Sequence, residues 1–404
     1  MTEEIVVSGI GMVTASGAGA EPTWDAVCSG LPTAKNDPAL EGLPVDLSSR
    51  ARLPDAGRGA AWRHDRATRL LSTAAREALR SAALDTADWD PAAVAVVIGT
   101  AAGGIATLET QHGKLLTGGH RALSPMTLPS FLPNMAAGHL ALELGVTGPS
   151  LQTSTACASG ATALITACLL LRSGACDIAV AGGTDAMATP LCVAAFAKLG
   201  ALSRRTGEPD AASRPFDRDR DGFVLGEGSG VLVLERRAHC IARRGRPLAV
   251  LAGAGATGDA HHPTAPHPAG AGLRAATRIA LAQAGAAPDD VDHVNAHGTS
   301  TRLNDAVEAA VIRDLYARRP PTVTSAKGSL GHTMGAAGAI EAALTVLSIS
   351  RGTAPPTANH TAPDADTSGI DVVAGTARAQ TIHLALSHSL GFGGHNTVLT
   401  LTAP

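Results

Sequence analysis

Cys157 has surroundings that suit a nucleophile. It lies between an extended segment at residues 150–154 and a predicted helix at residues 160–171, so we expect it in the first helical turn. Unpaired backbone N–H groups and the positive end of the helix dipole stabilise a thiolate there and lower the thiol pKa. Small neighbouring residues leave room for a substrate beside the sulfur. The alternative is a buried structural cysteine, our interpretation for Cys28, Cys168, Cys176, Cys192 and Cys240.

Two histidines occupy positions where α/β proteins place ligands. His297 follows a predicted strand at residues 291–295, and open α/β sheets bind ligands at the carboxyl ends of strands. His332 begins a glycine-flanked helix within residues 327–338. Because the positive end of a helix disfavours imidazolium, His332 is predicted to stay neutral and to donate a hydrogen bond. Each histidine, taken singly, also fits a structural role.

A glycine-rich segment, Gly391-Phe392-Gly393-Gly394-His395-Asn396, offers backbone N–H groups to a substrate oxygen. Such groups stabilise negative charge on an oxyanion. The alternative for this segment is a tight turn without a ligand.

Short apolar runs that stop at glycines predict buried strands, which position these residues. The predicted strands lie at residues 4–10, 94–99, 177–183, 230–235, 248–252, 291–295, 382–387 and 397–401. Apolar residues at helical spacing predict helices at residues 66–84, 160–171, 271–284, 305–317 and 336–349. Strands that alternate with helices indicate a mostly parallel, layered α/β fold.

Two parts of the chain share local patterns. Val6-Val7-Ser8-Gly9-Ile10-Gly11 resembles Val250-Leu251-Ala252-Gly253-Ala254-Gly255, and the segments at Cys157 and His332 each open a helix of small residues. These matches predict an internal duplication, with an extra segment in the first half at residues 101–150. Chance similarity is the alternative, because the chain has 45 glycines.

The composition excludes several classes of protein. The chain has 404 residues and a formal net charge of −3, and its aromatic residues are five Phe, three Trp and one Tyr. These features argue against a nucleic-acid partner, and the 45% hydrophobic content argues against disorder. The N-terminus is acidic, and the apolar run at residues 161–171 is too short to span a bilayer. We therefore expect a soluble, cytoplasmic protein with reduced cysteines and no membrane contact.

Four segments together resemble the signatures of the β-ketoacyl-[acyl-carrier-protein] synthases. They are Thr155-Ala156-Cys157-Ala158-Ser159-Gly160, His297-Gly298-Thr299-Ser300-Thr301, residues 327–338 and residues 391–396, in the family's order. The segment Ser213-Arg214-Pro215-Phe216-Asp217, continuing into residues 221–228, agrees as well. The resemblance covers Ile5 to Leu401 and is strongest to elongating synthase II enzymes and type II polyketide ketosynthases.

This resemblance implies the thiolase fold, in which two similar α/β halves form a five-layered α-β-α-β-α core. We expect an N-terminal half at residues 1–245, which carries the cysteine, and a C-terminal half at residues 246–404, which carries both histidines. The extra segment of the first half is expected at the dimer interface and over the acyl pocket.

The resemblance also implies a decarboxylative Claisen condensation. Cys157 accepts an acyl chain from an acyl carrier protein as a thioester. Malonyl-carrier protein then loses CO2, and its enolate attacks that thioester. His297 and His332 are expected to stabilise the enolate oxygen, and the backbone N–H groups of Cys157 and Phe392 to form a second oxyanion hole.

Further residues match family positions around this chemistry. Lys327 and Glu308 match the charged residues beside the histidines, for which an ordinary buried ion pair is the alternative. Thr299 and Thr301 match threonines that hydrogen-bond phosphopantetheine, and Phe392 matches the gate between the acyl pocket and the entrance. Because phosphopantetheine arrives on the carrier protein, no cofactor of the chain's own is expected.

The sequence departs from the family at four positions. Arg302 replaces a common proline, and Leu390 replaces the phenylalanine usual two residues before the gate. Ala102 and Thr127 stand where many fatty-acid enzymes carry bulky pocket residues. Smaller side chains there would deepen the acyl tunnel, which predicts a long, rigid or branched acyl chain such as a growing polyketide.

The carrier proteins of this family are acidic, so we expect a local basic patch for docking. The candidates are Arg63, Arg66, Arg69, Arg204 and Arg205, and ordinary solvated surface charges are the alternative. A second cluster, His261, His262 and His267, has metal-binding residue types but matches the family's loop near the pantetheine tunnel. No metal is therefore expected.

Three other functions fit part of the pattern. A biosynthetic thiolase needs a second catalytic cysteine, and an initiating synthase pairs one histidine with asparagine, whereas His297 and His332 fill both positions here. A non-catalytic chain-length-factor subunit generally lacks the nucleophile, whereas Cys157 is present. The sequence therefore favours a ketosynthase in a homodimer, or the catalytic subunit of a heterodimer with a chain-length-factor-like subunit.

Overall fold

The strands of the first half of the chain form a mixed half-sheet. The computed structural model describes residues 3–53 and 64–404. Its first half-sheet has the strand order β6 (Ser150–Thr153), β5 (Val94–Gly99), β7 (Ile178–Ala186), β8 (Glu227–Arg236) and β1 (Ile5–Thr14). The first three strands are parallel, and β8 and β1 join antiparallel. β1, β5 and β7 are buried along their whole length, as continuous apolar runs require.

The second half repeats this order and these directions. Its strands are β11 (Thr322–Thr324), β10 (His293–Asn295), β15 (Leu384–Gly391), β16 (His395–Thr402) and β9 (Ala249–Gly258), with β13 (Asp371–Val372) added at the edge. β11, β10 and β15 are parallel, and β16 and β9 are antiparallel. The two halves meet where Val6 and Val7 of β1 pair with Val250 and Ala249 of β9.

The repeated glycines of β1 and β9 allow close helix packing in both halves. A Cβ atom at Gly9 or Gly11 would overlap carbonyl oxygens of α3 (Arg66–Ser81). A Cβ atom at Gly253 or Gly255 would overlap carbonyl oxygens of α10 (Ala271–Gln283). Each glycine pair therefore lets a helix backbone approach the strand closely, which explains the similarity of the two segments.

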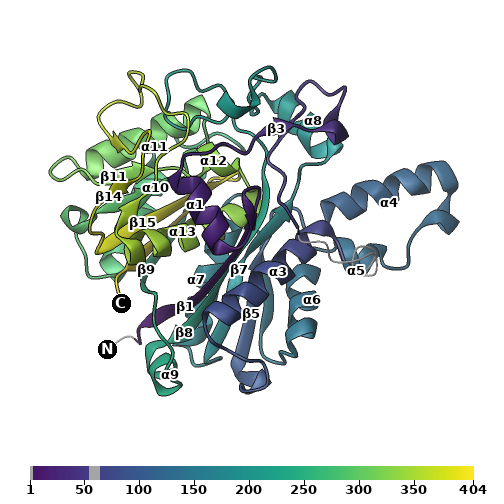
Figure 1. Ribbon diagram of the computed structural model, residues 1–404, viewed down its shortest axis with the longest axis horizontal. Helices are drawn as coiled ribbons and strands as arrows, with labels where there is room; N and C mark the ends of the chain where they lie inside the picture. The colour runs from purple at the N-terminus through teal and green to yellow at the C-terminus, as the bar shows by residue number, and fades with distance from the viewer. Residues whose placement is uncertain (1–2, 54–63) are drawn as a thin grey trace.

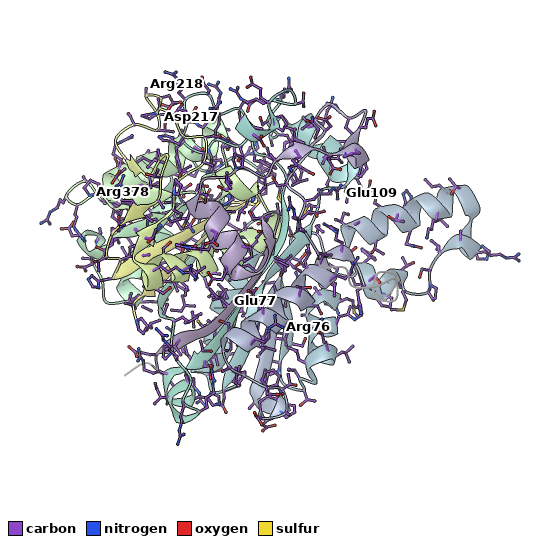
Figure 2. The ribbon with its side chains drawn as sticks, viewed as in Figure 1. Arg76, Glu77, Glu109, Asp217, Arg218 and Arg378 are labelled. Atoms are coloured by element: carbon purple, nitrogen blue, oxygen red, sulfur yellow. The ribbon has the colours of Figure 1, made fainter. Side chains whose placement is uncertain are left out.

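The helices complete a five-layered α-β-α-β-α arrangement, the thiolase fold that the resemblance implied. α7 (Ser159–Arg172) and α13 (Ala337–Arg351) lie between the half-sheets, and residues 337–349 of α13 are all buried (Figure 1). The outer faces are covered by α3 and α6 (Met135–Leu144) on the first half and by α10 and α11 (Arg302–Leu315) on the second. Glu77 stands on α3 (Figure 2), and its carboxylate accepts hydrogen bonds from the backbone N–H groups of Met12 and Ala20.

The prediction of a mostly parallel sheet is wrong. Only residues 392–394 separate β15 from β16, and a parallel pair needs a crossover of about a dozen residues. These strands therefore form an antiparallel hairpin, and β7 and β8 are antiparallel as well.

An arm projects from the first half between β5 and β6. It contains α4 (Ile105–Gly118), a 3-10 turn (His120–Ala122) and α5 (Thr127–Phe131), and α4 extends away from the body (Figure 1). The matching connection of the second half, from β10 to β11, contains only α11 and a turn. The extra segment predicted at residues 101–150 is this arm with α6. Leu116 and Leu128 on it are 73% and 60% exposed.

Other short elements support the loops around the two halves. They are α1 (Ala20–Cys28), α8 (Pro190–Leu199), α9 (Arg237–Ala242), α12 (Lys327–Leu330), β2 (Gly17–Ala18), β3 (Lys35–Asn36), β4 (Leu47–Ser48), β12 (Thr353–Ala354) and β14 (Arg378–Ala379). Within residues 3–53 and 64–404, no helix has both the length and the apolar character needed to cross a membrane.

Candidate active site

Cys157 lies just before α7, whose first residue is Ser159. Ala156 has a φ of 50°, in the left-handed region, so the chain turns sharply before the cysteine. Cys157 is 9% exposed, and its own backbone N–H and that of Phe392 lie close enough to the sulfur to favour the thiolate. Gly391 permits this approach, because a Cβ atom there would overlap the carbonyl oxygen of Thr155.

The expectation of a lowered thiol pKa at Cys157 is wrong. Burial is the largest cause and raises the pKa of the thiol to about 11. The charge of Lys327 and the two N–H groups act in the opposite direction, whereas the Asp185 carboxylate adds to the rise. The loss of solvent around the sulfur therefore outweighs the Lys327 charge and the two N–H groups.

His332 is held by backbone hydrogen bonds on both sides. Its N–H donates to Val224 over 2.8 Å, and its carbonyl accepts from the N–H of Gly226 over 2.8 Å. Nδ1 of the ring accepts from the N–H of Met334 over 3.3 Å. The neutral ring therefore carries its proton on Nε2.

His297 follows β10 and has the same tautomer for a different reason. Nδ1 lies 3.3 Å from Nζ of Lys327, and because an ammonium group only donates, Nε2 of His297 carries the ring proton. The ring centroids of His297 and His332 are 5.3 Å apart. Burial lowers the pKa of both rings well below the usual value, and the charge of Lys327 lowers them further. Both side chains are therefore neutral hydrogen-bond donors at neutral pH.

Lys327 and Glu308 both contact the His297 segment, but not as an ion pair with each other. Lys327 is buried and pairs with Glu341 of α13. Glu308 accepts hydrogen bonds from the N–H groups of His297 and Gly298, each over 2.8 Å. Burial raises the pKa of Glu341, and the Lys327 charge opposes this. Sequence reasoning missed Glu341, although it is the one charged residue in the apolar run at 335–349.

Asp185 is a second buried carboxylate that the sequence analysis missed. It stands on β7 and accepts hydrogen bonds from Thr100 Oγ1, Ala101 N–H and Gly335 N–H over 2.7–2.8 Å. It thereby ties the loop after β5 to the segment that follows His332. Burial raises its pKa to about 6 despite these hydrogen bonds.

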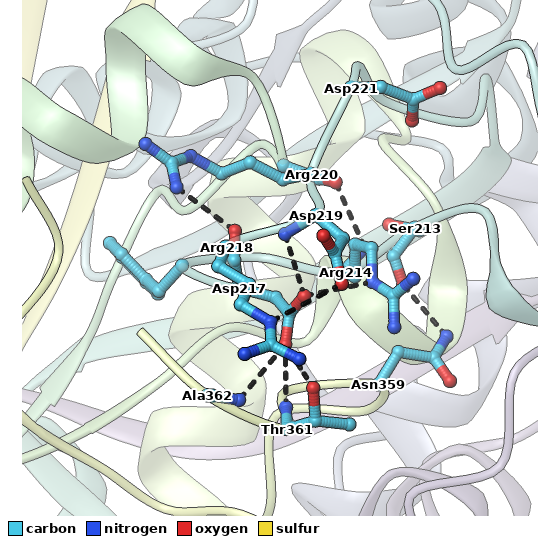
Figure 3. Close-up of polar contacts among 12 residues, drawn as sticks. Ser213, Arg214, Asp217, Arg218, Asp219, Arg220, Asp221, Asn359, Thr361 and Ala362 are labelled. Atoms are coloured by element: carbon cyan, nitrogen blue, oxygen red, sulfur yellow. Dashed lines mark hydrogen bonds and ion pairs between the residues drawn. The ribbon is translucent and has the colours of Figure 1, made fainter. Parts of the chain in front are cut away.

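The Asp217 carboxylate anchors the loop that forms another wall of the site. It accepts hydrogen bonds from the N–H groups of Thr361, Ala362 and Asp219 (Figure 3). Burial raises its pKa, but these hydrogen bonds outweigh burial and lower it to about 2. Arg220, in the same loop, is fully buried and pairs with Asp364 over 2.7 Å. The loop then continues into wall residues 221–223.

One cavity of about 320 Å³ brings the thiol, the two imidazoles and the glycine-rich turn together. Its lining includes Cys157, His297, His332 and Phe392. Thr299 and Thr301 also line it, and their hydroxyl groups are 2.8 Å apart. Other lining residues include Phe196, Phe223, Thr264, Arg302, Leu390 and His395.

Ala102 and Thr127, the predicted acyl-pocket residues, do not line this cavity. The N–H of Ala102 lies 3.4 Å from Asp185, and the hydroxyl group of Thr127 donates to the carbonyl of Ser124 over 2.6 Å. The cavity instead extends from Cys157 toward Thr264 and Arg302. Phe392, the predicted gate, lines it, with its ring centroid 6.3 Å from that of Phe196.

The five candidate docking arginines have different environments. Arg63 lies outside the described residues. The Arg66 guanidinium is engaged within the chain, because it pairs with buried Glu227 and donates to the carbonyl of Ala51, and its docking role stays a prediction. Arg69 lines a separate cavity beside α3 and α6.

Arg204 and Arg205 lie close to the main cavity in sequence, since residues 199–201 line it. The Arg205 side chain donates to the carbonyl of Asp219 and lies 3.9 Å from Glu208. The Arg204 side chain is exposed and forms no ion pair with any residue that the structure describes. Arg204 is therefore the better placed of the two for an external partner.

The histidine-rich loop near the cavity mouth does not assemble a metal site in the structure. The rings of His261 and His267 are 5.1 Å apart, whereas His262 accepts hydrogen bonds from the N–H groups of Thr264 and Ala265. Within the described ranges, no three His, Cys, Asp or Glu side chains are close enough to hold an ion.

Comparisons with known proteins agree with this geometry. The model of the beta-ketoacyl synthase N-terminal domain matches residues 2–239, and that of the C-terminal domain matches residues 248–361. The 3-oxoacyl-[acyl-carrier-protein] synthase 2 of Synechocystis sp. is 38% identical, over 98% of this chain and 97% of the relative.

Two solved structures superpose over their full length and that of this chain. The ishigamide ketosynthase/chain length factor has a TM-score of 0.93 and 32% identity. A type II PKS acyl-carrier protein in complex with its ketosynthase bound to the hexaketide has a TM-score of 0.93 and 29% identity. The chain belongs to the β-ketoacyl synthase family.

Proposed function

We propose that this chain is a ketosynthase that condenses a Cys157-bound acyl chain with a malonyl unit. The observation that carries the proposal is the convergence of three kinds of group on one cavity. They are the Cys157 thiol, the N–H groups of Cys157 and Phe392 beside it, and the Nε2–H donors of His297 and His332.

The first step is thioester exchange at Cys157. The sulfur attacks the acyl carbon of a carrier-bound thioester, a new C–S bond forms, and the carrier thiolate leaves with the proton that Cys157 released. The N–H groups of Cys157 and Phe392 stabilise the intermediate oxyanion. Because burial keeps the resting thiol protonated, its ionisation accompanies substrate binding rather than preceding it.

The second step is decarboxylation and condensation. Malonyl-carrier protein loses CO2, and the electron pair of the broken C–C bond forms an enolate whose oxygen accepts hydrogen bonds from His297 and His332. Each such donor is worth about 3 kcal/mol in the transition state. The enolate carbon then attacks the acyl thioester, and Cys157 leaves as a thiolate that is protonated again. Lys327 and Glu308 serve as positioning residues for His297.

The acyl substrate is a long polyketide-like chain in this proposal. The similarity to a ketosynthase structure described as bound to a hexaketide supports it, whereas Ala102 and Thr127 lie outside the cavity lining and give no support. Thr299 and Thr301 bind the pantetheine arm of the carrier through their hydroxyl groups, which already face each other at the cavity. The chain uses no cofactor besides that arm.

The protein partners are an acyl carrier protein and a second ketosynthase-like subunit. The structures described as a ketosynthase with its chain length factor, and with its carrier protein, support both partners. The exposed leucines of the arm suit an interface, so the active form is a homodimer or a heterodimer with a chain-length-factor-like subunit. A cytoplasmic setting agrees with the six cysteines, which are all free.

Mass spectrometry of the protein offered a panel of acyl-carrier thioesters tests the proposal. We expect acylation on Cys157 and none in Cys157→Ala, and the accepted acyl group identifies the substrate class. Absence of acylation with every partner subunit and thioester would support a non-catalytic subunit of a heterodimer instead.

A further inference from the structure

His388 is a buried imidazole that the proposed chemistry does not use. It stands on β15, is 0% exposed, and precedes the gate residue Phe392 on the same strand and turn. Its Nδ1 lies 3.1 Å from Oε1 of Glu308. Its Nε2 is buried and has no hydrogen-bond partner among residues 3–53 and 64–404. Glu308 is therefore the hydrogen-bond partner of the His388 ring, through Nδ1.

Glu308 connects His388 to the catalytic histidine. Its Oε1 also accepts from the N–H of His297, and its Oε2 accepts from the N–H of Gly298. Burial raises the pKa of Glu308, but the hydrogen bond and charge of His388, with the two N–H groups, bring it below the usual value. The ionised carboxylate only accepts, so Nδ1 of His388 carries a proton and donates it.

The His297 segment depends on this carboxylate for its conformation. Gly298 and Ser300 have φ values of 36° and 69°, so the segment is an irregular turn and not a continuation of β10. Glu308 satisfies two of its buried N–H groups, and an unsatisfied buried N–H is costly. The orientation of the Glu308 carboxylate therefore fixes where Nε2 of His297 points.

We propose that His388 is a positioning residue for His297: it locks the Glu308 carboxylate against the N–H groups of His297 and Gly298. This inference rests on the proposed function, because it concerns the step in which His297 stabilises the malonyl enolate. Cys157 lies just before α7, and its N–H donors are its own and that of Phe392 in the 392–394 turn, so acyl transfer to Cys157 does not require this lock.

The experiment compares His388→Leu with His388→Asn in two assays. His388→Leu removes the donor, whereas the amide N–H of His388→Asn can still reach the carboxylate. We expect His388→Leu to slow decarboxylation of malonyl-pantetheine about ten- to hundredfold, and to change acylation of Cys157 by hexanoyl-pantetheine less than threefold. His388→Asn should keep decarboxylation within about threefold of the unsubstituted protein.

His293→Leu is a matched control. His293 is another 0% exposed imidazole, on the neighbouring strand β10, but its hydrogen bonds go to Thr322 and Thr324. The same loss of a buried ring should therefore leave the ratio of the two rates unchanged. The double variant His388→Leu/Glu308→Gln should decarboxylate no more slowly than Glu308→Gln, because both substitutions remove the same contact between His388 and the Glu308 carboxylate.

The outcomes separate this inference from the proposed function. Absence of both reactions in the unsubstituted protein would overturn both. Normal activity there, combined with equal loss of the two steps in His388→Leu or no rescue in His388→Asn, would overturn only the role of His388. If His388→Leu does not fold, His388→Met supplies the same comparison, and failure of both to fold indicates a purely structural residue and likewise overturns it.

Discussion

The ammonium group of Lys327 lies 3.3 Å from Nδ1 of His297 and also forms an ion pair with Glu341. One buried cation thus fixes the tautomer of a catalytic ring and neutralises a carboxylate. These two effects can be separated by substitution.

Lys327→Met should lower both stability and decarboxylation. The uncompensated Glu341 carboxylate costs about 3–5 kcal/mol in free energy of unfolding. Lys327→Met/Glu341→Leu should recover most of that stability, but its decarboxylation should stay low because Nδ1 of His297 still lacks its donor. Urea unfolding and malonyl-pantetheine decarboxylation measure the two effects, and recovery of both together would contradict the positioning role.

The Cys157 thiol should react with iodoacetamide as a protonated, buried thiol. Because burial raises its pKa to about 11, the alkylation rate should rise tenfold per pH unit from pH 7 to pH 10 without a plateau. Lys327→Met should react more slowly at every pH, since the Lys327 charge lowers this pKa. Mass spectrometry of the Cys157 peptide measures the alkylation rate. A plateau of that rate below pH 8 would indicate a preformed thiolate and contradict the prediction.

Asp185 should give stability a distinct pH dependence. Its folded-state pKa is raised from 3.8 to about 6, so its stabilising contribution is present below pH 4 and is lost as pH rises through 6. Asp185→Asn lacks this titration. The stability of the unsubstituted protein relative to Asp185→Asn should therefore fall by about 2 kcal/mol between pH 4 and pH 7.5. Urea unfolding of both proteins at several pH values tests this, and a constant or widening difference would disagree.

Gly391→Ala should move the backbone of the 392–394 turn away from the Cys157 sulfur. A Cβ atom there overlaps the carbonyl oxygen of Thr155, so the N–H of Phe392 has to move away from the Cys157 sulfur. Loss of this donor should reduce the acylation rate about a hundredfold or more. Gly258→Ala is the control, because Gly258 pairs with the same hairpin but has open space at its Cβ position. Equal rates for the two variants would remove Phe392 from the oxyanion hole.

Arg204→Glu should weaken use of the carrier protein more than use of a small thioester. The Arg204 side chain is exposed near the cavity and, within the described part of the chain, forms no ion pair, so it is available to an acidic partner. We expect about a tenfold rise in KM for acyl-carrier protein and little change for acyl-pantetheine. Arg172→Glu, at the far end of α7 from Cys157, is the control. The same loss with both substrates would argue against docking at Arg204.

Local patterns in the sequence predicted the elements well. The strand at 94–99 matches β5, and the helix at 160–171 is one residue shorter at each end than α7. Strands β1 and β9 extend four and six residues past their predicted ends, because their glycines lie inside the strand and under a helix. The sequence alone does not show whether a glycine ends a strand or lies within the strand and allows a helix backbone to pack closely against it.

Contacts between residues far apart in the sequence could not be predicted from local patterns. Asp185 and Gly335 are 150 residues apart, and nothing local indicates that one binds the other. The same holds for Arg66, an apparent surface charge on α3 that pairs with buried Glu227. Local patterns pointed to Cys157, His297 and His332, and the family resemblance supplied the roles of the other motif residues. Glu341, Asp185 and His388 lie outside the recognised motifs.

The short hairpin between β15 and β16 limits how the entrance of the site can open. β16 pairs with β15 and β9 along its whole length, and β15 also pairs with β10 at residues 385–387, so the part of the hairpin free to pivot lies at and beside residues 392–394. Gly393 and Gly394, with φ values of 86° and 76°, supply the freedom for that rotation. We therefore expect any opening at Phe392 to be a rearrangement of these few residues, with the amplitude of a loop motion and not of a relative movement of the two halves.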